Sequence, residues 1–463
     1  MSVHAVVLAA GKGTRMKSDL AKVLHRAAGR TLLDWVLASI GEVKPTRTVV
    51  VVGHQSDAVV ESLPDGCESV LQQPQNGTGH AVQVALGRLG DLDPGDTVLI
   101  AYGDMPLVGV PLYRTLAELP PGTAVRMATV DPGPAGFGRI VRDDGGGVRA
   151  IVEERDCTPE QAAITERNVG IYAFVAGDLV DAIAHLGTDN AQGELYLTDV
   201  IGSLAAAGKT IETVTADEVE VMGVNSHADL AEVQAVLRRR INDDLMAEGV
   251  WMLDPERTYV DATVTVRGGA MLYPGVHLEG TTVVEEGAGV GPDTRVIDST
   301  IGSGAVVSYS VVRESEIGSG ASVGPFASLR PGSVLRAGAK AGTFVETKKT
   351  EIGEGAKVPH LSYMGDAVIG AGANVGAGSI TCNYDGYEKH ETVIGERAFI
   401  GSDTMLVAPV SVGDGAVTGA GSVITTDVEP GALAVERSPQ KDVPGYAERR
   451  AARQRAKDAE QGN

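Results

Sequence analysis

The chain has 463 residues, which is too long for a single compact core and favours two domains. Aromatic residues make up only 4% of it, while there are 60 glycines, a composition that suits narrow interiors filled by aliphatic side chains. The formal net charge of −22 argues against nucleic acid or an anionic membrane as a general partner.

Cysteine usage and hydropathy indicate the compartment. The three cysteines (Cys67, Cys157 and Cys382) have neither paired nor zinc-like spacing, which fits a reducing cytosol. The apolar residues 3–10 are too few and wrongly flanked for a signal peptide, and no run approaches membrane-spanning length. We therefore expect a cytoplasmic protein that does not use a membrane.

The first half of the chain alternates between strand-like and helix-like segments. This alternation predicts a Rossmann-like α/β domain whose mostly parallel sheet has helices on both faces. Ligands of such sheets bind at the carboxyl ends of the strands, which is where residues 11–15 and 103–104 fall. The expected strands are residues 3–10, 49–52 and 98–101, and the expected helices are residues 31–40 and 78–89.

The second half places an aliphatic residue at every sixth position, often with glycine directly behind it. A period of six fits neither a helix nor an ordinary strand and predicts a left-handed parallel β-helix of hexapeptide repeats. Three hexads to a coil give roughly nine or ten coils. Two uninterrupted series are Val260, Val266, Leu272, Leu278, Val284, Val290 and Val296, and Ile394, Ile400, Leu406, Val412, Thr418 and Ile424.

These patterns predict four segments: an α/β domain over residues 1–226, a linker helix over 227–250, a β-helix domain over 251–438 and a basic, loosely held tail over 439–463. The hexads slip between Thr347 and Ile352 and, more strongly, between Thr381 and Ile394. A solenoid accommodates extra residues as loops, and loops on a rigid scaffold commonly hold functional residues.

A glycine-rich loop follows the first expected strand. Glycines at this place let backbone N–H groups approach phosphate oxygens, and Arg15 and Lys22 supply positive charge. The spacing matches neither the Walker P-loop nor the GxGxxG fingerprint, and an isolated loop of this kind can also be a simple turn. The whole string is more specific and resembles the sugar-1-phosphate nucleotidyltransferases: Leu8-Ala9-Ala10-Gly11-Lys12-Gly13-Thr14-Arg15-Met16, followed by Lys22.

That resemblance implies a reaction that joins a nucleoside triphosphate to a sugar phosphate, releases pyrophosphate and needs no protein nucleophile. Arg15 and Lys22 would then be catalytic through charge neutralisation. Asp104 and Asn225 would hold Mg²⁺, although by residue type alone they also suit a turn and a helix cap. The positions matching the family's nucleotide-sugar contacts are Leu8, Ala9, Ala10, Gly11, Lys22, Gln72, Gly77, Thr78, Tyr102, Gly103, Asp104, Gly138, Glu153, Asn168 and Asn225. Within this set Glu154 remains an alternative to Glu153 as the contact to the sugar.

Polar residues gather around the register slips of the predicted β-helix. A histidine side chain titrates near neutrality, so His360 is the candidate general base. A β-helix can also be purely structural, and a lone histidine commonly is. Lysine, arginine and tyrosine side chains near His360 favour instead a site for a phosphorylated sugar. The set is Arg330, Glu346, Lys348, His360, Tyr363, Asn374, Asn383, Tyr384 and Lys389.

Together the two halves resemble the bacterial bifunctional UDP-N-acetylglucosamine pyrophosphorylase / glucosamine-1-phosphate N-acetyltransferase family, in the same order over nearly the whole chain. The resemblance implies that the C-terminal half acetylates glucosamine-1-phosphate with acetyl-CoA. The N-terminal half would then use UTP and Mg²⁺ to turn N-acetylglucosamine-1-phosphate into UDP-N-acetylglucosamine for the cell envelope. It also implies a homotrimer formed through the β-helix. The C-terminal stretches that match are residues 330–332, 344–349, 360–363, 376–378 and 383–386.

The same resemblance implies individual roles in the C-terminal half. His360 would take the proton from the sugar's 2-amine, and Glu346 would orient its imidazole. The implied sugar-phosphate contacts are Arg330, Lys348, Tyr363, Asn374 and Lys389, and the implied acetyl-CoA contacts are Ala377, Asn383, Tyr384, Ser402, Ala420 and Arg437. One departure is Ala21, which precedes Lys22 where the family usually has proline.

Two other interpretations use the same sequence features. One is a monofunctional nucleotidyltransferase whose β-helix only oligomerises or regulates. The other is a regulatory subunit that has kept both folds and lost its chemistry. The presence of Arg15, Lys22 and Asp104 argues against the second, since an inactive site has no use for that arrangement of charge.

Overall fold

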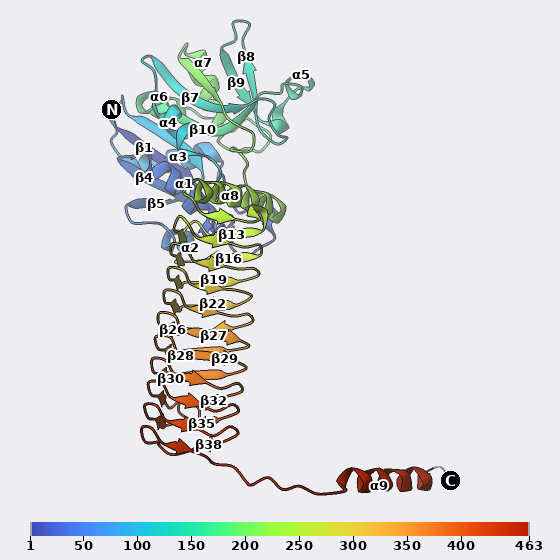
Figure 1. The fold of residues 1–463 in the computed structure, drawn as a ribbon. Helices are drawn as coiled ribbons and strands as arrows, with labels where there is room; N and C mark the ends of the chain where they lie inside the picture. Colours follow the sequence, from blue (N-terminus) through green and yellow to red (C-terminus); the bar gives the residue numbers. More distant parts are fainter. Residues whose placement is uncertain (1, 462–463) are drawn as a thin grey trace. The chain divides into compact units, whose positions relative to one another are not determined.

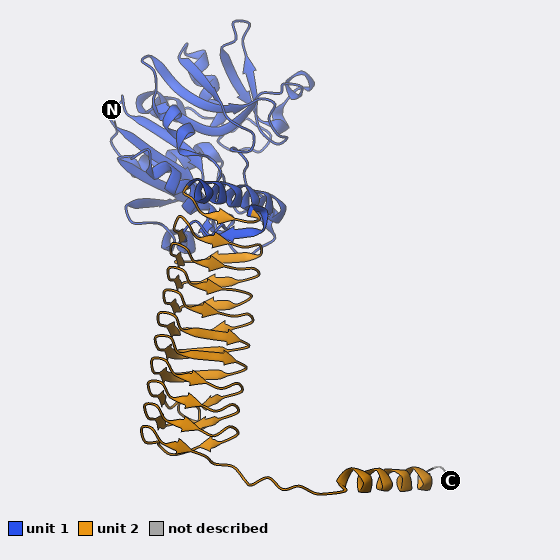
Figure 2. Ribbon diagram, viewed as in Figure 1, with its two compact units in different colours: residues 1–247, 255–264 blue, residues 248–254, 265–463 orange. Residues whose placement is uncertain are grey.

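The computed structural model describes residues 2–461, and the chain divides into two compact units (Figure 2). Unit 1 comprises residues 1–247 and 255–264, and unit 2 comprises residues 248–254 and 265–463.

Unit 1 is built on a mixed sheet with the strand order β11-β7-β10-β6-β1-β4-β5, and β8 and β9 extend it beside β10 (Figure 1). Strands β6, β1, β4 and β5 are parallel, as predicted, whereas β10 is antiparallel to both of its neighbours β6 and β7. The strands are β1 (Val3–Leu8), β4 (Arg47–Val52), β5 (Cys67–Leu71), β6 (Thr97–Tyr102), β7 (Thr123–Val130), β8 (Arg139–Arg142), β9 (Val148–Val152), β10 (Arg167–Val175) and β11 (Thr210–Thr215), with a separate hairpin of β2 (Arg26–Ala27) and β3 (Arg30–Thr31).

Helices cover both faces of this sheet because its central strands are apolar on both sides. Val49 and Val51 of β4 face one core, which α3, α6 and α7 complete, and Val50 and Val52 face the other, which α1 and α4 complete. The helices of unit 1 are α1 (Leu32–Gly41), α2 (Ser56–Glu61), α3 (Thr78–Leu89), α4 (Val110–Ala117), α5 (Pro159–Ala162), α6 (Ala176–Ile183), α7 (Thr198–Ala206) and α8 (His227–Ala247). The predicted strands and helices of this half are therefore confirmed.

Helix α8 belongs to unit 1. Its Val233 and Leu237 are buried in a small core with Met16, Leu32 and Leu107. Arg240 in the same helix donates a hydrogen bond to the carbonyl of Leu107 at 2.7 Å. The segment predicted as a linker helix therefore packs on the α/β unit through an apolar face.

Unit 2 is a parallel β-helix, as the hexads predict (Figure 1). The sixth-position residues of both series within this unit, from Val266 to Ile424, are at most 5% exposed. One sheet has 11 strands, one for each coil. The number of coils is slightly larger than the nine or ten predicted from the hexads, because the coils begin at Trp251 and continue to Leu433.

Two series of strands form the faces of this β-helix. The 11-stranded sheet contains β12 (Trp251–Met252), β15 (Met271–Leu272), β18 (Gly289–Val290), β21 (Val306–Val307), β24 (Ser322–Val323), β27 (Lys340–Thr343), β29 (Lys357–His360), β31 (Asn374–Val375), β34 (Phe399–Ile400), β37 (Val417–Thr418) and β39 (Leu433–Ala434). The other unit 2 strands are β14 (Thr265–Val266), β16 (Val276–Glu279), β17 (Val283–Val284), β19 (Arg295–Ile297), β20 (Thr300–Ile301), β22 (Val311–Arg313), β23 (Glu316–Ile317), β25 (Ser328–Leu329), β26 (Val334–Leu335), β28 (Glu346–Ile352), β30 (Tyr363–Ile369), β32 (Ile380–Cys382), β33 (Thr392–Ile394), β35 (Met405–Val407), β36 (Val410–Val412) and β38 (Val423–Ile424). Strand β13 (Thr258–Val260) lies in unit 1.

The predicted excursion interrupts one coil. Val368 pairs with Val393, 25 positions further on, whereas Val393 pairs with Ser411 after the usual 18. The extra residues form a small loop in which Tyr384 and Lys389 make an isolated antiparallel bridge. The larger register slip is therefore an ordered loop beside intact coils.

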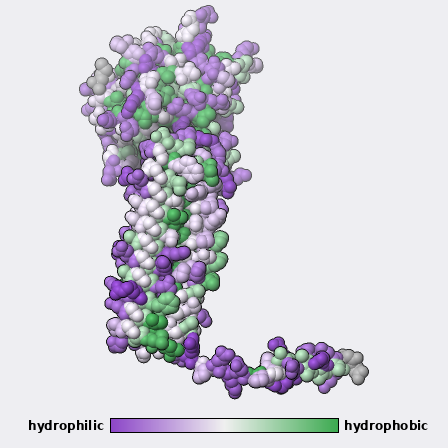
Figure 3. All heavy atoms as spheres, in the orientation of Figure 1, coloured by the Kyte–Doolittle hydropathy of each residue, from purple (hydrophilic) through white to green (hydrophobic). Residues whose placement is uncertain are grey.

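Three further observations concern the chain as described. A helix not predicted from the sequence, α9 (Tyr446–Gln461), lies in the basic tail and is mostly hydrophilic (Figure 3). Cys67, Cys157 and Cys382 are free. None of the helices formed by residues 2–461 has the length and apolarity needed to span a membrane.

Candidate active sites

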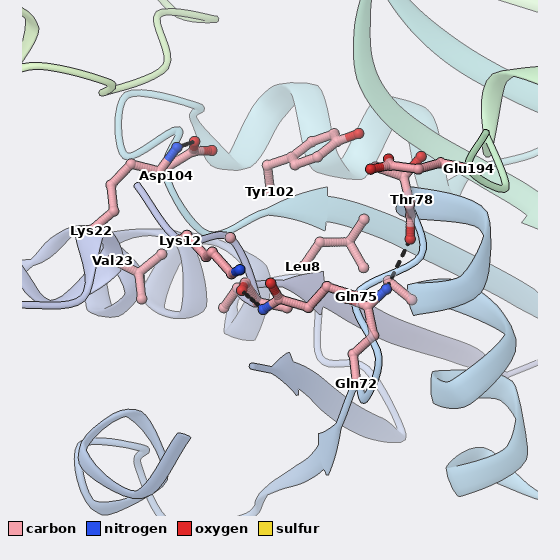
Figure 4. A pocket seen from close by; sticks show the side chains of 15 residues that line it. Leu8, Lys12, Lys22, Val23, Gln72, Gln75, Thr78, Tyr102, Asp104 and Glu194 are labelled. Carbon is pink, nitrogen blue, oxygen red and sulfur yellow. Dashed lines mark hydrogen bonds and ion pairs between the residues drawn. The ribbon is translucent and has the colours of Figure 1, made fainter. Parts of the chain in front are cut away.

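A cavity of about 470 Å³ opens in unit 1 where β1, β5 and β6 end (Figure 4). Ten of the predicted nucleotide-sugar residues line it. Its lining consists of Leu8, Ala9, Ala10, Gly11, Lys12, Lys22, Val23, Gln72, Gln75, Gly77, Thr78, Ala81, Tyr102, Asp104 and Glu194. The glycine loop and the residues after β6 thus meet at one edge of the sheet, as expected for parallel strands.

The glycine loop shapes this cavity in two ways. A Cβ atom on Gly11 would meet nothing within 4 Å, so the chain leaves open space here. Gly13 has φ +58°, and a Cβ on it would lie 2.7 Å from Cβ of Lys22. Glycine at position 13 therefore allows the loop to turn and to pack directly against the lysine.

Lys22, Asp104 and Asn225 converge at the rim of the cavity. The Lys22 ammonium group contacts the Asp104 carboxylate, and the close-up shows the two side chains pointing toward each other (Figure 4). Lys22 Nζ also donates to Oδ1 of Asn225 at 3.1 Å, and Arg15 Nη2 donates to the same oxygen at 2.9 Å. Because one ammonium group reaches both oxygens, those oxygens face a common point and could share a small hard cation.

No group of three or more His, Cys, Asp or Glu side chains that could hold a metal ion occurs within residues 2–461. The Asp104 and Asn225 pair is compatible with that finding, since Mg²⁺ commonly takes one or two protein oxygens and completes its shell with water and phosphate.

Four of the predicted nucleotide-sugar contacts form a second wall of the cavity: Gln72, Gly77, Thr78 and Tyr102. Gln72 is 5% exposed, and its Nε2 donates to the carbonyl of Gly77 at 2.9 Å. Thr78 Oγ1 accepts a hydrogen bond from the backbone N–H of Leu197 at 3.0 Å. Burial raises the pKa of the Tyr102 hydroxyl, and the carboxylates of Glu153 and Asp104 raise it further. Tyr102 therefore stays neutral and can act only as a neutral hydrogen-bonding group or packing surface.

Gly138, Glu153 and Asn168 lie together, outside the lining of the 470 Å³ cavity. The Asn168 N–H donates to the Gly138 carbonyl at 2.8 Å, and a Cβ on Gly138 would lie 3.6 Å from the Glu153 carboxyl carbon. Glu153 accepts a hydrogen bond from Thr198 Oγ1 at 3.0 Å, and burial raises the pKa of its carboxyl. Glu154 is instead paired with Arg139 at 3.0 Å.

Sequence reasoning missed five residues of the cavity lining: Lys12, Val23, Gln75, Ala81 and Glu194. Lys12 lies inside the glycine motif and could have been included for its charge. Glu194 lies beside Leu195, whose carbonyl accepts a hydrogen bond from the Gly79 N–H at 2.8 Å. This contact joins segments that are far apart in the chain, so no local sequence pattern predicts it. Arg15, Gly103 and Asn225 do not line the cavity. Gly103 lies between Tyr102 and Asp104 in the chain, Asn225 is hydrogen-bonded to Lys22, and Arg15 is hydrogen-bonded to Asn225.

In unit 2 the predicted sugar-phosphate residues cluster on successive coils. Glu346 and Tyr363 pair directly in register, and Arg330 Nη1 donates to Glu346 Oε1 at 3.0 Å. Lys348 Nζ lies 3.5 Å from Oδ2 of Asp366, an oxygen that also accepts from Asn383 Nδ2 at 2.5 Å.

Asp366 was not predicted from the sequence; nothing in its immediate neighbours distinguishes it from a turn residue. In the fold it is the carboxylate that holds Lys348 and Asn383 together. Lys389 approaches Lys348, and the like charge of Lys348 lowers the pKa of the Lys389 ammonium group. This concentration of positive charge suits a phosphate group.

His360 and four of the six predicted acetyl-CoA residues lie on successive coils and form what we call the His360 column: His360, Ala377, Ser402, Ala420 and Arg437. The N–H of Gly378 donates to the His360 carbonyl at 3.3 Å, and the N–H of Asp403 donates to the Ala377 carbonyl at 2.7 Å. The column then continues through Ser402, Ala420 and Arg437: the Gly421 N–H donates to the Ser402 carbonyl, and Arg437 Nη1 donates to the Ala420 carbonyl, each at 2.8 Å.

Glu346, Asn374 and Tyr384 lie outside this column. Within residues 2–461, no hydrogen bond joins His360 to Glu346, whose carboxylate faces Arg330. Asn374 begins β31 and pairs with Lys357 in the preceding coil. Tyr384 is 59% exposed on the excursion loop, and its hydroxyl donates to the Gly386 carbonyl at 2.7 Å.

Comparison with known proteins assigns a class to each unit. The MobA-like NTP transferase domain family matches residues 5–198, and the bacterial transferase hexapeptide family, with six repeats, matches residues 391–426. The chain thus joins a nucleotidyltransferase unit to a hexapeptide-repeat transferase unit.

Relatives of similar length match both units together. "Bifunctional protein GlmU" of Streptomyces avermitilis is 48% identical over 453 residues, covering 96% of this chain and 94% of the relative. The proteins of the same name from Thermobifida fusca and Carboxydothermus hydrogenoformans are 48% and 46% identical over 454 and 448 residues, each covering 96% of this chain and 94% and 100% of the relative. The chain belongs to the family of bifunctional GlmU proteins.

Proposed function

We propose that this chain catalyses two steps of UDP-N-acetylglucosamine synthesis. Unit 2 transfers the acetyl group of acetyl-CoA to the 2-amine of glucosamine-1-phosphate, and unit 1 joins the product to the uridylyl group of UTP with release of pyrophosphate. The observation that supports this most is the presence of two sites in one chain. Unit 1 has a glycine-loop cavity rimmed by Lys22, Asp104 and Asn225, and unit 2 has both a basic cluster and the His360 column.

Uridylyl transfer needs positioning and charge neutralisation more than covalent chemistry by the protein. A phosphate oxygen of N-acetylglucosamine-1-phosphate attacks the α-phosphorus of UTP in line, the bond to the β-phosphate oxygen breaks, and pyrophosphate leaves. Arg15 and Lys22 offset the negative charge that gathers on the phosphoryl oxygens. Mg²⁺, held by Asp104 and Asn225, would supply further charge neutralisation when bound.

Acetyl transfer needs a base because an ammonium group is not nucleophilic. In our proposal His360 accepts a proton from the 2-amine as its nitrogen attacks the thioester carbonyl, and the C–S bond then breaks to release CoA. Orientation of the imidazole by Glu346 requires that carboxylate to turn from Arg330 toward His360. The two partners are 45% and 44% exposed, so the ion pair they form now is weak enough to exchange.

Arg330, Lys348 and Lys389 hold the sugar phosphate in this proposal, together with Tyr363. A bound phosphate would relieve the repulsion that lowers the pKa of Lys389. Asn374, Asn383 and Tyr384 would frame the amine and the acetyl group. Ala377, Ser402, Ala420 and Arg437 would contact acetyl-CoA along the column of successive coils.

A homotrimer formed through unit 2 is part of the proposal. Four large apolar side chains project from one corner of successive coils: Tyr309, Phe326, Phe344 and Leu361, which are 42%, 55%, 56% and 63% exposed. The rings of Phe326 and Phe344 stack with centroids 5.4 Å apart. An apolar row of this kind favours burial against further copies of the chain. We also place the enzyme in the cytoplasm, a reducing compartment that suits its three free cysteines.

The test is the release of free CoA thiol from glucosamine-1-phosphate and acetyl-CoA in the absence of nucleotide. We expect release by the wild type and its loss in His360→Ala, while that variant retains UTP-dependent pyrophosphate formation from N-acetylglucosamine-1-phosphate. His185→Ala, an exposed histidine of unit 1, is the matched control and should retain both activities.

Two outcomes would contradict the proposal. Absence of thiol release by the wild type, with pyrophosphate formation intact, would leave a monofunctional nucleotidyltransferase whose β-helix is a scaffold. Absence of pyrophosphate formation with either sugar phosphate would remove the role assigned to unit 1.

A further inference from the structure

Two arginines are buried side by side on strands β8 and β10 of unit 1. Arg139 of β8 and Arg167 of β10 pair directly in register, and they are 5% and 9% exposed. Burial lowers the pKa of the Arg167 guanidinium, and the like charge of Arg139 lowers it further. Two buried cations this close together are stable only if a neighbouring negative charge compensates them.

Glu154 is the carboxylate that pairs with this cluster. Arg139 Nη2 donates to Glu154 Oε1 at 3.0 Å, and Arg139 Nη1 donates to the Phe137 carbonyl at 2.7 Å. The Arg139 guanidinium and the Gly136 N–H lower the pKa of Glu154, which therefore stays ionised. Glu154 thus ties the segment before β8 to the turn that follows β9.

Compensation by Glu154 is incomplete. Nε of Arg139 and both Nε and Nη1 of Arg167 are buried atoms without a hydrogen-bond partner among the described residues. A Cβ on Gly133 would overlap the Arg167 side chain, so that side chain packs directly on the backbone there. The Asp131 carboxylate also favours the charged form of Arg167, but within residues 2–461 it makes no hydrogen bond to either arginine. Removing Glu154 would therefore leave two buried guanidinium groups facing each other with no hydrogen-bonded counter-charge.

Each member of this cluster is the sequence neighbour of a predicted sugar contact. Arg139 follows Gly138, Glu154 follows Glu153, and Arg167 precedes Asn168. Movement of the cluster would therefore displace the three sugar contacts together, because Asn168 is hydrogen-bonded to Gly138 and Glu153 lies against Gly138.

We propose that Glu154 is a positioning residue for uridylyl transfer, which acts on the sugar site through its neighbour Glu153. By neutralising Arg139 and Arg167, Glu154 fixes the turn that presents Glu153 toward Gly138 and Asn168. This inference rests on the uridylyl transfer proposed above for unit 1.

The experiment is steady-state kinetics of Glu154→Gln with separate titrations of N-acetylglucosamine-1-phosphate and UTP. We expect the KM for the sugar phosphate to rise roughly tenfold to a hundredfold, since small displacements of contacts cost that much, while the KM for UTP stays within about twofold. Glu212→Gln is the matched control, because Glu212 of β11 pairs with the partly buried Arg126 of β7 at 2.6 Å, and neither residue adjoins a predicted sugar contact in the sequence. It should leave both KM values unchanged.

Rescue distinguishes positioning from direct contact. Arg167→Leu removes one of the two guanidinium groups that Glu154→Gln leaves without a hydrogen-bonded counter-charge. The KM for the sugar phosphate should therefore return close to the wild-type value in the double variant Glu154→Gln/Arg167→Leu. A glutamate that touches the sugar could not be rescued in this way, and Glu153→Gln should not respond to Arg167→Leu.

A double variant no better than Glu154→Gln, or an equal rise of both KM values in Glu154→Gln, would overturn the proposal. If Glu154→Gln fails to fold, the double variant decides alone: a folded double variant with near-normal KM supports the inference, and an unfolded one contradicts it. Failure of the wild type to form pyrophosphate would instead refute the proposed function.

Discussion

Nζ of Lys22 lies 3.1 Å from Oδ1 of Asn225, although 203 positions separate the two residues in the chain. The same ammonium group contacts Asp104, and the two side chains of that ion pair are 14% and 17% exposed. The loop after β1, the end of β6 and the start of α8 are therefore joined at one point. Lys22 is the residue that joins them.

Lys22→Met should lower UTP-dependent pyrophosphate release by about a hundredfold or more, because it removes a charge that opposes the developing negative charge and leaves Asp104 without its partner. CoA thiol release should stay within about twofold of the wild type, since unit 2 is untouched. Lys17→Met, an exposed lysine five positions earlier, is the control and should have no effect on either reaction. An equal loss of both activities in Lys22→Met would indicate misfolding in place of a local role.

The sequence predicted best what repeats or what forms a contiguous string. The hexads predicted the β-helix because each sixth residue, such as Leu278 or Ile400, meets the same buried environment in every coil. The glycine loop predicted a phosphate-binding edge because its residues are adjacent in the chain. Both kinds of signal are local or periodic, so no knowledge of the fold was needed to find them.

Other features depend on contacts between distant segments and had no local signal. Asp366 becomes important only when the fold brings Lys348 and Asn383 to its carboxylate. The choice between Glu153 and Glu154 could not be made from two adjacent glutamates, because what separates them is Arg139 on another strand. Substrate contacts in both units remain predictions that kinetics must test.

Protonation of Glu153 should weaken the binding of the sugar phosphate for uridylyl transfer in mildly acidic buffer. Burial raises the pKa of this carboxyl, and nearby Asp156 and Asp199 raise it while the Thr198 hydrogen bond opposes the shift. As the pH falls, Glu153 therefore gains its proton earlier than an ordinary glutamate with a pKa of about 4.3 and stops accepting hydrogen bonds on both oxygens. The KM for the sugar phosphate should rise with acidity in the wild type and be high but flat in Glu153→Gln.

The same pKa shift predicts a stability difference of definite sign. Since the folded-state pKa lies above the unfolded value, ionised Glu153 destabilises the native state above its folded-state pKa, and this cost disappears below the unfolded pKa. Glu153→Gln should therefore raise the Tm of unit 1 at neutral pH and leave it nearly unchanged in acid, as measured by calorimetry. A Tm difference that grows toward acid pH would show that the sign is wrong.

Gly77→Ala should damage the cavity wall that Gln72, Gly77, Thr78 and Tyr102 form. Gly77 has φ +94°, and a Cβ on it would lie 2.5 Å from the Leu195 carbonyl oxygen. The strained backbone should cost about 1–3 kcal/mol of stability and raise the KM for UTP. Gly87→Ala in α3, the helix that follows Gly77, is the control, because nothing lies within 4 Å of its Cβ position and an exposed helical glycine gains roughly 0.5–1 kcal/mol on change to alanine. Equal KM values for UTP in the two variants would contradict this reading of Gly77.

Two adjacent valines in β21 test directly whether the sixth-position residues of the hexads form the core. Val307 is 0% exposed inside the coil, whereas Val306 is 50% exposed on its outer surface. Val307→Ala should lower the free energy of unfolding of unit 2 by about 1.5–3 kcal/mol, because a buried side chain is truncated. Val306→Ala should change it by no more than about 0.5 kcal/mol. Urea unfolding followed by circular dichroism measures both variants on the same strand. Similar losses in the two would mean that the outer face is as tightly packed as the interior, contrary to the repeat pattern that predicts this fold.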